Sequence, residues 1–534
     1  MYILAYDIGT TGLKCCLFSL NQQIKLVAGH YATYNLYILE NGGAEQDVDE
    51  WWSALVDCTQ NLIKKTGIDP IEIQGITFCS QMQGLVLVDE KCNALRRPMS
   101  YMDQRAGAEM KETENFGISV AGVNARMMLK SLHQTHAAST SVKDPLWKYK
   151  WVQKNEPEIF GRVYKWLDVK EYLICRMTGR FIMTPDSAYA TFLYDSRKNK
   201  QCWSEELCRM YGVNMEHLPE IVPCDAVVGN LLQAPAKELG LYGGTAVYGS
   251  GGDASLIGIG AGSTSFGDTH VYWGTSGWIG TVIDKQKVDI GNMIAGIVGA
   301  QQDKYNYFAE METAGKCFEW VKDHLVLDEI NIYLKKMDVE HSIEAKYISL
   351  YDYMSKVVDQ VEPGCGGVMF APWLHGNRCP FEDPNSAGMF FNIKLDTGKK
   401  ELIRAVLEGI CYHLRWMLEC EDKKVQTSET IRFVGGGSLS PVTSQMLADI
   451  TGRKVETIRE AKDVGALGAA LLVAVGSGVI HSLEESKQLV KVNQVYEPRQ
   501  EYRGIYNRNY KVFKRLYHCN RKSYQMLNNE GEQP

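Results

Sequence analysis

Two acidic residues stand at the ends of apolar segments and are followed by glycine-rich turns. Asp7 lies near the end of an apolar run and precedes Gly9-Thr10-Thr11-Gly12, and Asp253 follows the apolar run 245–248 and two glycines. A second tetrad of the same kind, Gly274-Thr275-Ser276-Gly277, comes after another apolar run. A carboxylate at the end of a buried strand can serve as a base or hold a cation, and the N–H and hydroxyl groups of such turns can bind phosphate. The residue types therefore point to phosphoryl transfer.

The two tetrads are separated by half of the chain. This spacing predicts two domains of similar design, each offering one phosphate-binding turn to a shared cleft. Chance is the alternative, because Gly, Thr and Ser are common in turns of every kind. Each tetrad directly follows a strand pattern, which favours the paired arrangement.

The composition is that of a globular protein whose partner is a small molecule. The 534 residues are 45% hydrophobic and 23% charged, enough for two or three domains with full cores. A net charge of −7 without long runs of like charge argues against nucleic acid and against an anionic membrane surface as partners. The fifteen cysteines show neither a disulfide framework nor zinc-type spacing, and the chain begins with a strand rather than a signal peptide. We therefore expect a cytoplasmic protein with buried thiols.

Alternating strand and helix patterns predict an α/β fold. In the first half we expect strands at 2–8, 13–20, 24–34, 73–78 and 84–89, helices at 47–65, 145–154 and 157–177, and a short strand or turn at 189–194. In the second half we expect a strand at 270–273, helices at 309–325, 401–420, 441–451 and 502–526, strands at 366–374 and 431–434, and a glycine-rich core helix at 464–480. The predicted domains are 1–248, 249–484 and a C-terminal helical tail at 485–534.

Two polar segments of the first half could bind a polyhydroxylated ligand. One is the break Cys79-Ser80-Gln81-Met82-Gln83, and the other is Tyr101–Ala106, which holds Asp103, Gln104 and Arg105. Buried sugar hydroxyls need both donors and acceptors, and these side chains supply them. A salt-bridged helix start is the alternative for Asp103–Arg105, and a turn residue that faces away from the ligand is the alternative for Gln83. Lys148 and Trp151 are interpreted as a solvated charge and a core anchor.

The segment Gly435-Gly436-Gly437-Ser438 stands between a predicted strand and a predicted helix. Consecutive glycines there would let a flat or phosphorylated ligand lie against the backbone and the helix N-terminus, although a tight strand-to-helix turn would use glycine as well. Neither a Walker loop nor the glycine-rich loop of protein kinases is present in the sequence.

Together these segments resemble the FGGY carbohydrate kinases, within the actin and heat-shock ATPase superfamily, and among them the xylulokinase branch most. Asp7–Gly12 with Lys14 is similar to the family's first phosphate motif, Gly274–Gly277 to its second, and Gly435–Ser438 with Gln445 to its adenosine motif. The similarity extends to Gly251-Gly252-Asp253, to Met82 and to the segment around Asp103.

The resemblance implies two actin/ribonuclease-H-like domains of mixed sheet with flanking helices around a central ATP and sugar cleft. It implies Asp253 as the catalytic base, Asp7 as the Mg2+ residue, and Met82, Gln83, Asp103 and Asp253 as sugar-binding residues. The ATP-binding set it implies is Gly9, Thr10, Thr11, Lys14, Gly274, Thr275, Ser276, Gly315, Gly435, Gly436, Gly437, Ser438 and Gln445. A homodimer is a candidate assembly.

The expected activity is ATP-dependent phosphorylation of a small sugar, with a ketopentose such as xylulose first. Gln83 and Ala254 depart from the family pattern, which commonly has His and Asn there, so another ketose, a polyol or an aldonate is the alternative substrate. A non-catalytic sugar- or nucleotide-sensing member of the superfamily, or a hydrolase, is the rival class. The base Asp253 and the polar segments favour the kinase.

Overall fold

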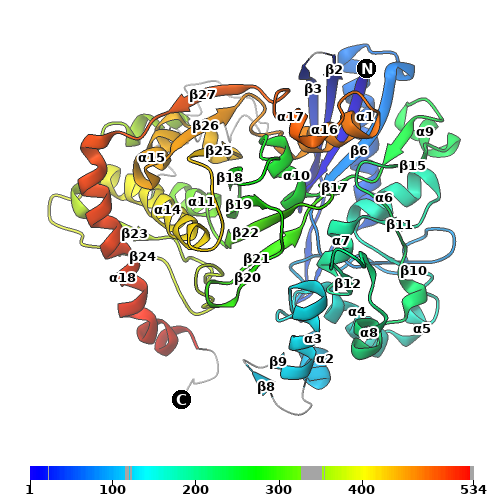
Figure 1. The fold of residues 1–534 in the computed structure, drawn as a ribbon, viewed down its shortest axis with the longest axis horizontal. Helices are drawn as coiled ribbons and strands as arrows, with labels where there is room; N and C mark the ends of the chain where they lie inside the picture. The colour runs from blue at the N-terminus through cyan, green and yellow to red at the C-terminus, as the bar shows by residue number, and fades with distance from the viewer. Residues whose placement is uncertain (22, 115–118, 121–122, 326–351, 354, 530–534) are drawn as a thin grey trace.

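Two large β-sheets with the same strand order form the centre of the molecule (Figure 1). We describe a computed structural model in which residues 1–534 are placed except 22, 115–118, 121–122, 326–351, 354 and 530–534. The first sheet has the order β15-β16-β6-β1-β2-β3 with β17 beside β6, and the second has the order β20-β21-β22-β19-β18-β25-β26-β27. In each sheet an antiparallel hairpin is extended by a third antiparallel strand, and its first strand pairs in parallel on the other side. The predicted repeat of mixed sheets is confirmed.

The strands of the first sheet are β1 Tyr2–Ile8, β2 Gly12–Leu20, β3 Ile24–Thr33, β6 Ile73–Ser80, β15 Val227–Asn230, β16 Ala246–Tyr248 and β17 Gly251–Gly252. Those of the second are β18 Thr269–Trp273, β19 Gly277–Ile283, β20 Val288–Asp289, β21 Ile294–Val298, β22 Tyr305–Met311, β25 Thr430–Val434, β26 Lys454–Ile458 and β27 Val492–Tyr496. Short two-stranded pairs are β4 Tyr37–Ile38 with β5 Ala44–Glu45, β7 Val86–Val88 with β10 Lys165–Leu167, β8 Ser119–Val120 with β9 Val123–Asn124, β11 Ile182–Met183 with β14 Glu220–Ile221, β12 Tyr194–Asp195 with β13 Cys202–Trp203, and β23 Met369–Ala371 with β24 Met389–Phe391.

The α-helices are α1 Val48–Thr66, α2 Gly107–Glu114, α3 Ala125–Thr135, α4 Pro145–Asn155, α5 Pro157–Phe160, α6 Val169–Thr178, α7 Pro185–Ala190, α8 Glu205–Tyr211, α9 Gln233–Leu239, α10 Asp253–Gly260, α11 Gly315–His324, α14 Lys399–Asp422, α15 Pro441–Thr451, α16 Val464–Gly476, α17 Leu483–Ser486 and α18 Arg503–Asn528. No helix among the described residues is long and apolar enough to cross a membrane.

Helices α10 and α16 lie between the two sheets (Figure 1). Helix α16 packs on β1, β2 and β6, and the same apolar cluster includes Leu256 of α10 together with Trp278 and Val434 of the second sheet. Glycines let the two helices cross closely: a Cβ on Gly260 would lie 2.0 Å from the Val464 carbonyl oxygen, and one on Gly468 would lie 2.1 Å from that of Leu256. The crossing therefore tolerates no side chain at either position.

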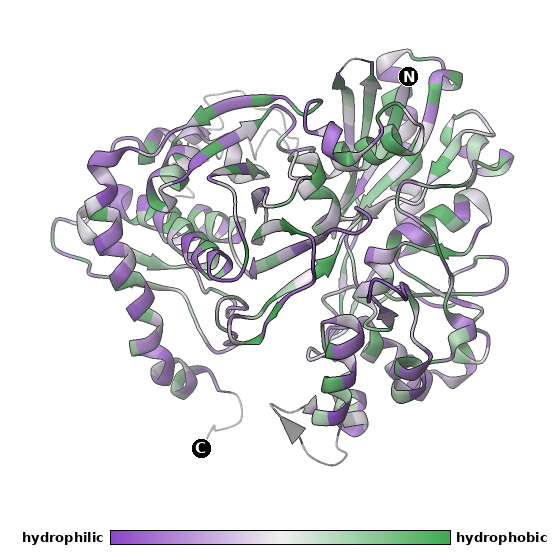
Figure 2. Cartoon of the chain, in the orientation of Figure 1, coloured by the Kyte–Doolittle hydropathy of each residue, from purple (hydrophilic) through white to green (hydrophobic). Residues whose placement is uncertain are grey.

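The outer faces of the sheets are covered by longer amphipathic helices. Helix α1 packs its tryptophans on the first sheet, while α11, α14 and α18 cover the second. In Figure 2 helix α18 is coloured mainly hydrophilic, yet its Tyr506, Phe513 and Tyr517 are buried in the core of the second sheet. The terminal helix expected from 502 is thus confirmed, and it is part of a core.

The prediction of one helix over 157–177 was wrong. The segment forms the short helix α5, strand β10 and helix α6, because Trp166 and Leu167 pair with β7 and Asp168 then caps a new helix by accepting a hydrogen bond from the Val169 N–H at 2.8 Å. The three-residue strand was too short to stand out from the helix-favouring residues around it.

The helix predicted from 309 was also placed wrongly, because residues 305–311 form strand β22 with strictly alternating burial, and α11 begins only at Gly315. Residues 189–194 include the end of helix α7, a turn at 191–192 and the start of β12, so the predicted short strand or turn is confirmed in part. Lys148 is completely buried, so its interpretation as a solvated charge was wrong.

We expect Gly468→Ala to lower the free energy of unfolding by about 1–3 kcal/mol, because the added methyl group must push apart the backbones of α10 and α16. Gly504 of α18 is the matched control, since a Cβ there would meet nothing within 4 Å. Gly504→Ala should leave stability unchanged or raise it by up to about 1 kcal/mol. Urea unfolding of both variants measures this, and equal stabilities would contradict the close crossing.

Candidate active site

The turn between β1 and β2 is held in place by one hydrogen bond within it and by another from outside it. The Gly9 N–H donates to the Gly12 carbonyl at 2.9 Å, and the Gln46 side-chain amide donates to the Thr10 carbonyl at 2.7 Å. The Thr10 hydroxyl lies 3.2 Å from the Tyr101 hydroxyl. Thr11 is exposed. The turn therefore has a fixed backbone, with hydroxyl groups on its surface.

Asp7 and Lys14 face each other across the β1–β2 hairpin, where they are register partners. The Lys14 ammonium is 3.0 Å from the carboxylate of Asp463, the residue that precedes α16. Burial raises the pKa of Asp7 above its ordinary value, although the charge of Lys14 lowers it. For Lys14, burial lowers the pKa, but the charges of Asp463 and Asp7 raise it more, so the pKa of Lys14 lies above its ordinary value. A Cβ on Gly465 would lie 3.2 Å from an Asp7 carboxylate oxygen, so the N-terminus of α16 approaches this acid.

The turn between β18 and β19 is bound by the N-terminus of helix α11. The Gly315 N–H donates to the Gly274 carbonyl at 2.8 Å, and the N–H groups of Ala314 and Lys316 donate to the Thr275 carbonyl, both at 3.1 Å. Gly315 must be glycine here, because a Cβ would lie 2.3 Å from the Gly274 carbonyl oxygen. Thr275 is exposed and Ser276 is half-buried, so their side chains remain accessible.

Asp253 opens helix α10 directly after β17, which pairs with the end of β6. The Gly252 N–H donates to the buried carboxylate of Asp186 at 2.8 Å, and Met82 packs so closely on Gly252 that a Cβ would lie 2.2 Å from its sulfur. Burial raises the pKa of Asp253 to about 7, the Ala254 N–H opposes this shift, and the charges of Asp7 and Glu310 add to it. Asp253 is thus a fixed carboxyl group whose ionisation lies near neutrality.

Tyr101 and Glu310 connect the groups of the two halves. The Tyr101 hydroxyl is hydrogen-bonded to that of Thr10. Burial raises the pKa of Tyr101, the bond to Thr10 lowers it, and the charges of Asp253, Glu310 and Glu312 raise it again. Glu310 is the register partner of Trp278, which follows the second turn. Its carboxylate is 2.5 Å from Arg378. The first turn, Asp253 and the strands beside the second turn therefore converge on one region.

The segment around Gln83 is held through its backbone. Its N–H donates to Asp168 at 2.9 Å, its carbonyl accepts from Lys148 at 2.8 Å, and its φ of 62° lies in the left-handed region. The Gln83 side chain is half-buried and makes no hydrogen bond with any described residue. Its amide is thus available to a ligand.

Asp103 is completely buried, and its carboxylate is hydrogen-bonded to other residues of the protein. It accepts from the Ala44 N–H at 2.8 Å and from the Arg105 guanidinium at 2.8 Å, and Arg105 also reaches Glu45. The salt bridge that was the alternative for this segment is therefore present. Lys148 lies near it: burial lowers the pKa of Lys148 to about 8, against the charges of Asp103, Asp144 and Asp168.

The glycine-rich turn after β25 lies beside the second phosphate-type turn, because β25 and β18 pair in parallel. Gly435 has a φ of 87°, and a Cβ on Gly437 would lie 2.5 Å from the Trp273 ring. The Ser438 hydroxyl donates to the Gly435 carbonyl at 2.7 Å, and the Gln445 amide donates to Asp449 at 2.9 Å and to the Glu497 carbonyl at 2.8 Å. These contacts account for the glycines as a tight turn, and they leave the role of Gly436, Ser438 and Gln445 in ATP binding a prediction.

Several residues of this region were missed by reasoning from sequence. Asp186 fixes the peptide before Asp253, Asp463 binds Lys14, and Glu310 adds charge near Asp253. Asp186 follows Pro185 at a helix start, and Asp463 precedes a glycine-rich helix. Both patterns predict a helix-capping residue and give no sign of a partner elsewhere in the chain. Glu310 stood inside a predicted helix that is a strand.

Comparison with known protein families identifies the two halves of the chain. Residues 2–260 match the N-terminal domain of the FGGY family of carbohydrate kinases, and residues 270–477 match its C-terminal domain. The chain belongs to the FGGY family of carbohydrate kinases. The resemblance inferred from its motifs is confirmed, and the chain is a sugar kinase by family.

Individual relatives match over nearly the whole length. A xylulose kinase of Bacillus subtilis is 27% identical over 520 residues, which cover 97% of this chain and 96% of the relative. A gluconokinase of Bacillus subtilis is 27% identical over 516 residues, covering 94% of each. The crystal structure of a ligand-bound xylulose kinase from Lactobacillus acidophilus has a TM-score of 0.83 at 24% identity and covers 98% of this chain and 99% of that one. The expected two-domain α/β fold is confirmed.

The pKa of Asp253 predicts how the reaction depends on pH. A base must be ionised to accept a proton, so we expect kcat/KM for the sugar to fall as the pH drops below about 7, the raised pKa of Asp253. One unit lower, about a tenth of the carboxyl groups stay ionised. Initial rates at low sugar concentration over a pH series measure this, with the exposed-site variant Asp396→Asn as control. A profile that is flat through neutral pH would contradict the assignment.

Proposed function

We propose that the chain transfers the terminal phosphoryl group of ATP to a hydroxyl of a small ketose, with xylulose as the first candidate. The observation that carries the proposal is Asp253: a carboxyl group with a pKa near 7, fixed at the start of α10, close to Asp7 and to residues beside both phosphate-type turns. The curated relatives named xylulose kinase support the choice of sugar.

Each proposed role follows from the chemistry of the residue. A sugar hydroxyl is a weak nucleophile at neutral pH, so Asp253 would accept its proton as the new bond to phosphorus forms. The N–H and hydroxyl groups of the Gly9–Gly12 and Gly274–Gly277 turns would donate to phosphate oxygens, where a fixed donor is worth a few kcal/mol in the transition state. Lys14, held by Asp463 at 3.0 Å, would add positive charge near the first turn.

The acidic groups near the first turn fit Mg2+. Asp7 offers carboxylate oxygens, the ligand type that Mg2+ prefers, and burial raises its pKa although the Lys14 charge lowers it. Bound there with ATP, Mg2+ would offset the charge of the phosphates. Asp7 would hold it, and Lys14 would balance what remains.

The charges along the Gln83 segment support a neutral sugar over an aldonate. An aldonate carboxylate needs a cation that is free to bind it. Among the described residues here, Arg105 is 2.8 Å from Asp103, Arg378 is 2.5 Å from Glu310, and Lys148 donates to the Gln83 carbonyl while the charges of Asp103, Asp144 and Asp168 act on its pKa. Each cation is already matched, so a carboxylate ligand would meet surplus negative charge. Met82 and Gln83 would contact the sugar, and Asp103 would act mainly by fixing Arg105.

Two further expectations remain proposals. A cytoplasmic location is supported by the fifteen cysteines, all of which are free thiols in the structure. A homodimer remains a candidate assembly, which gel filtration with light scattering would test.

The function is tested with the purified protein, ATP, Mg2+ and a panel of ketopentoses, ketohexoses, polyols and aldonates, read by ADP release. We expect phosphorylation of xylulose, and a loss of turnover in Asp253→Asn of about two to four orders of magnitude, the usual range for a lost general base. Sugar binding, followed by calorimetry, should persist in that variant. Asp396→Asn, on the surface, is the control. Near wild-type turnover in Asp253→Asn would make Asp253 structural.

Specificity is tested separately at position 83. We expect Gln83→His to change the ranking of sugars without abolishing phosphorylation, because the flexible amide offers two donors and an acceptor whereas the imidazole ring offers one of each in a fixed geometry. The clamped backbone at this position limits the change to the side chain. Steady-state constants over the same panel decide it, and an unaltered ranking would remove Gln83 from the sugar site.

A further inference from the structure

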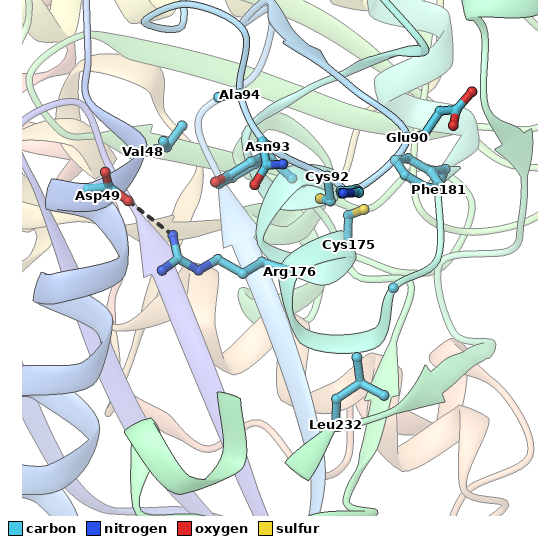
Figure 3. A pocket seen from close by; sticks show the side chains of 13 residues that line it. Val48, Asp49, Glu90, Cys92, Asn93, Ala94, Cys175, Arg176, Phe181 and Leu232 are labelled. Carbon is cyan, nitrogen blue, oxygen red and sulfur yellow. Dashed lines mark hydrogen bonds and ion pairs between the residues drawn. The ribbon is translucent and has the colours of Figure 1, made fainter. Parts of the chain in front are cut away.

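A pocket lies apart from the region around Asp253, on the outer side of the first half of the chain. Its volume is about 560 Å³, and it is formed by the start of α1, the turn 89–94 after β7, and the C-terminal half of α6 (Figure 3). Its lining includes two cysteines, Cys92 and Cys175, and two cationic residues, Lys91 and Arg176. Nothing in the proposed phosphoryl transfer uses these groups.

The two cysteines form a contacting pair inside this pocket. Figure 3 shows the two side chains near each other, and the contact with Cys92 raises the pKa of the Cys175 thiol. Cys92 is half-buried, Cys175 is 1% exposed, and both are free thiols. One thiol of the pair is therefore reachable from the pocket and the other lies behind it.

Both cysteines stand on rigid pieces of backbone. The Asp89 carboxylate accepts from the N–H groups of Lys91 at 2.9 Å and Asn93 at 2.8 Å, and from the Asn93 amide at 3.0 Å, which fixes the turn. Cys92 takes a φ of 65° in this turn, a conformation that side chains other than glycine, Asn and Asp rarely adopt. Cys175 lies in helix α6, whose last turn closes on Gly179. Joining the sulfurs would thus need little further ordering of the chain.

We propose that Cys92 and Cys175 are a modification site that reacts with low-molecular-weight peptide disulfides of the glutathione disulfide type and closes to an internal disulfide. In the first step the Cys92 thiolate attacks one sulfur of the reagent, forms a mixed disulfide and releases one peptide thiol. In the second step the Cys175 sulfur attacks the Cys92 sulfur, its proton leaves with the second peptide thiol, and the Cys92–Cys175 bond forms. The protein loses two electrons, and the reagent gains them as two thiols.

The order of the steps follows from exposure and from the pKa of the Cys175 thiol. Cys92 is half-buried and can meet the reagent first, whereas Cys175 is 1% exposed, and the contact with Cys92 and burial raise the pKa of its thiol above the usual range, so Cys175 reacts second. Arg176 lies on the pocket wall, 3.3 Å from the Asp49 carboxylate and 4.4 Å from the centre of the Trp52 ring. In the lining, Arg176 and Lys91 are balanced by the carboxylates of Asp49 and Glu90. The pocket therefore offers no surplus charge that would select a disulfide reagent by the charge it carries.

The reaction is tested on the full-length reduced protein, equilibrated with glutathione disulfide and glutathione at several ratios, quenched with acid, denatured, alkylated and analysed by peptide mass spectrometry. We expect a cross-linked peptide pair containing Cys92 and Cys175, without retained glutathione. Cys202 and Cys519, which are exposed and alone, should carry glutathione at most.

Variants separate the two roles. In Cys175→Ser the mixed disulfide on Cys92 should persist, and in Cys92→Ser the thiol of Cys175 should stay free, whereas the buried control Cys208→Ser should cross-link as the wild type does. The wild-type peptides decide the matter even if a variant fails to fold. Free Cys92 and Cys175 under conditions that modify Cys202 would overturn the proposal, and so would a stable mixed disulfide on Cys92 in the wild type. Neither result depends on which sugar the kinase uses.

Discussion

The close crossing of α10 and α16 is the constraint on which the rest of the structure depends. Gly260 and Gly468 allow the two helix backbones to touch, and this contact sits between the two sheets. Asp253 is the first residue of one helix, and Asp463, which binds Lys14, directly precedes the other. The packing that joins the halves therefore also sets where the base and the first phosphate-type turn stand relative to each other. A change at the crossing would move both.

Charge is distributed unevenly around that crossing. Asp7, Asp253 and Glu310 are close enough for their charges to act together, and burial raises the pKa of Asp253 to about 7. A protein gains no stability from such a cluster, since each carboxylate resists the ionisation of the next. In the proposed function a bound cation would offset this charge. The same residues that cost stability without ligands would then include the proposed base, Asp253, whose pKa lies near neutrality.

The sequence was sufficient for the plan of the molecule and for the groups that act through their own side chains. The first hairpin, the strand that leads into Gly274, the helix at 48–66 and the turns at Gly9 and Gly274 follow from local patterns of period and glycine, whereas strand β19 of the second hairpin was not predicted. The partners that act across long separations were not predicted either: Asp186 binds the Gly252 N–H, 66 positions away, and α16 packs on strands near the N-terminus. Lys148 was misjudged for the same reason, because only the fold shows the carboxylates that allow its burial.

Position 83 shows why the reaction can be inferred more securely than the sugar. The backbone of Gln83 is fixed on both sides by Asp168 and Lys148, and neither contact depends on what side chain stands there. The fold therefore holds the position and leaves its side chain free to vary, whereas close contacts require glycine at Gly315 and Gly437 beside the second turn. In the proposed function the reaction depends on constrained positions of this kind, and the choice of sugar depends on a clamped but replaceable one. A sequence pattern therefore indicates the type of reaction directly, whereas the choice of sugar must be measured with variants of the side chain.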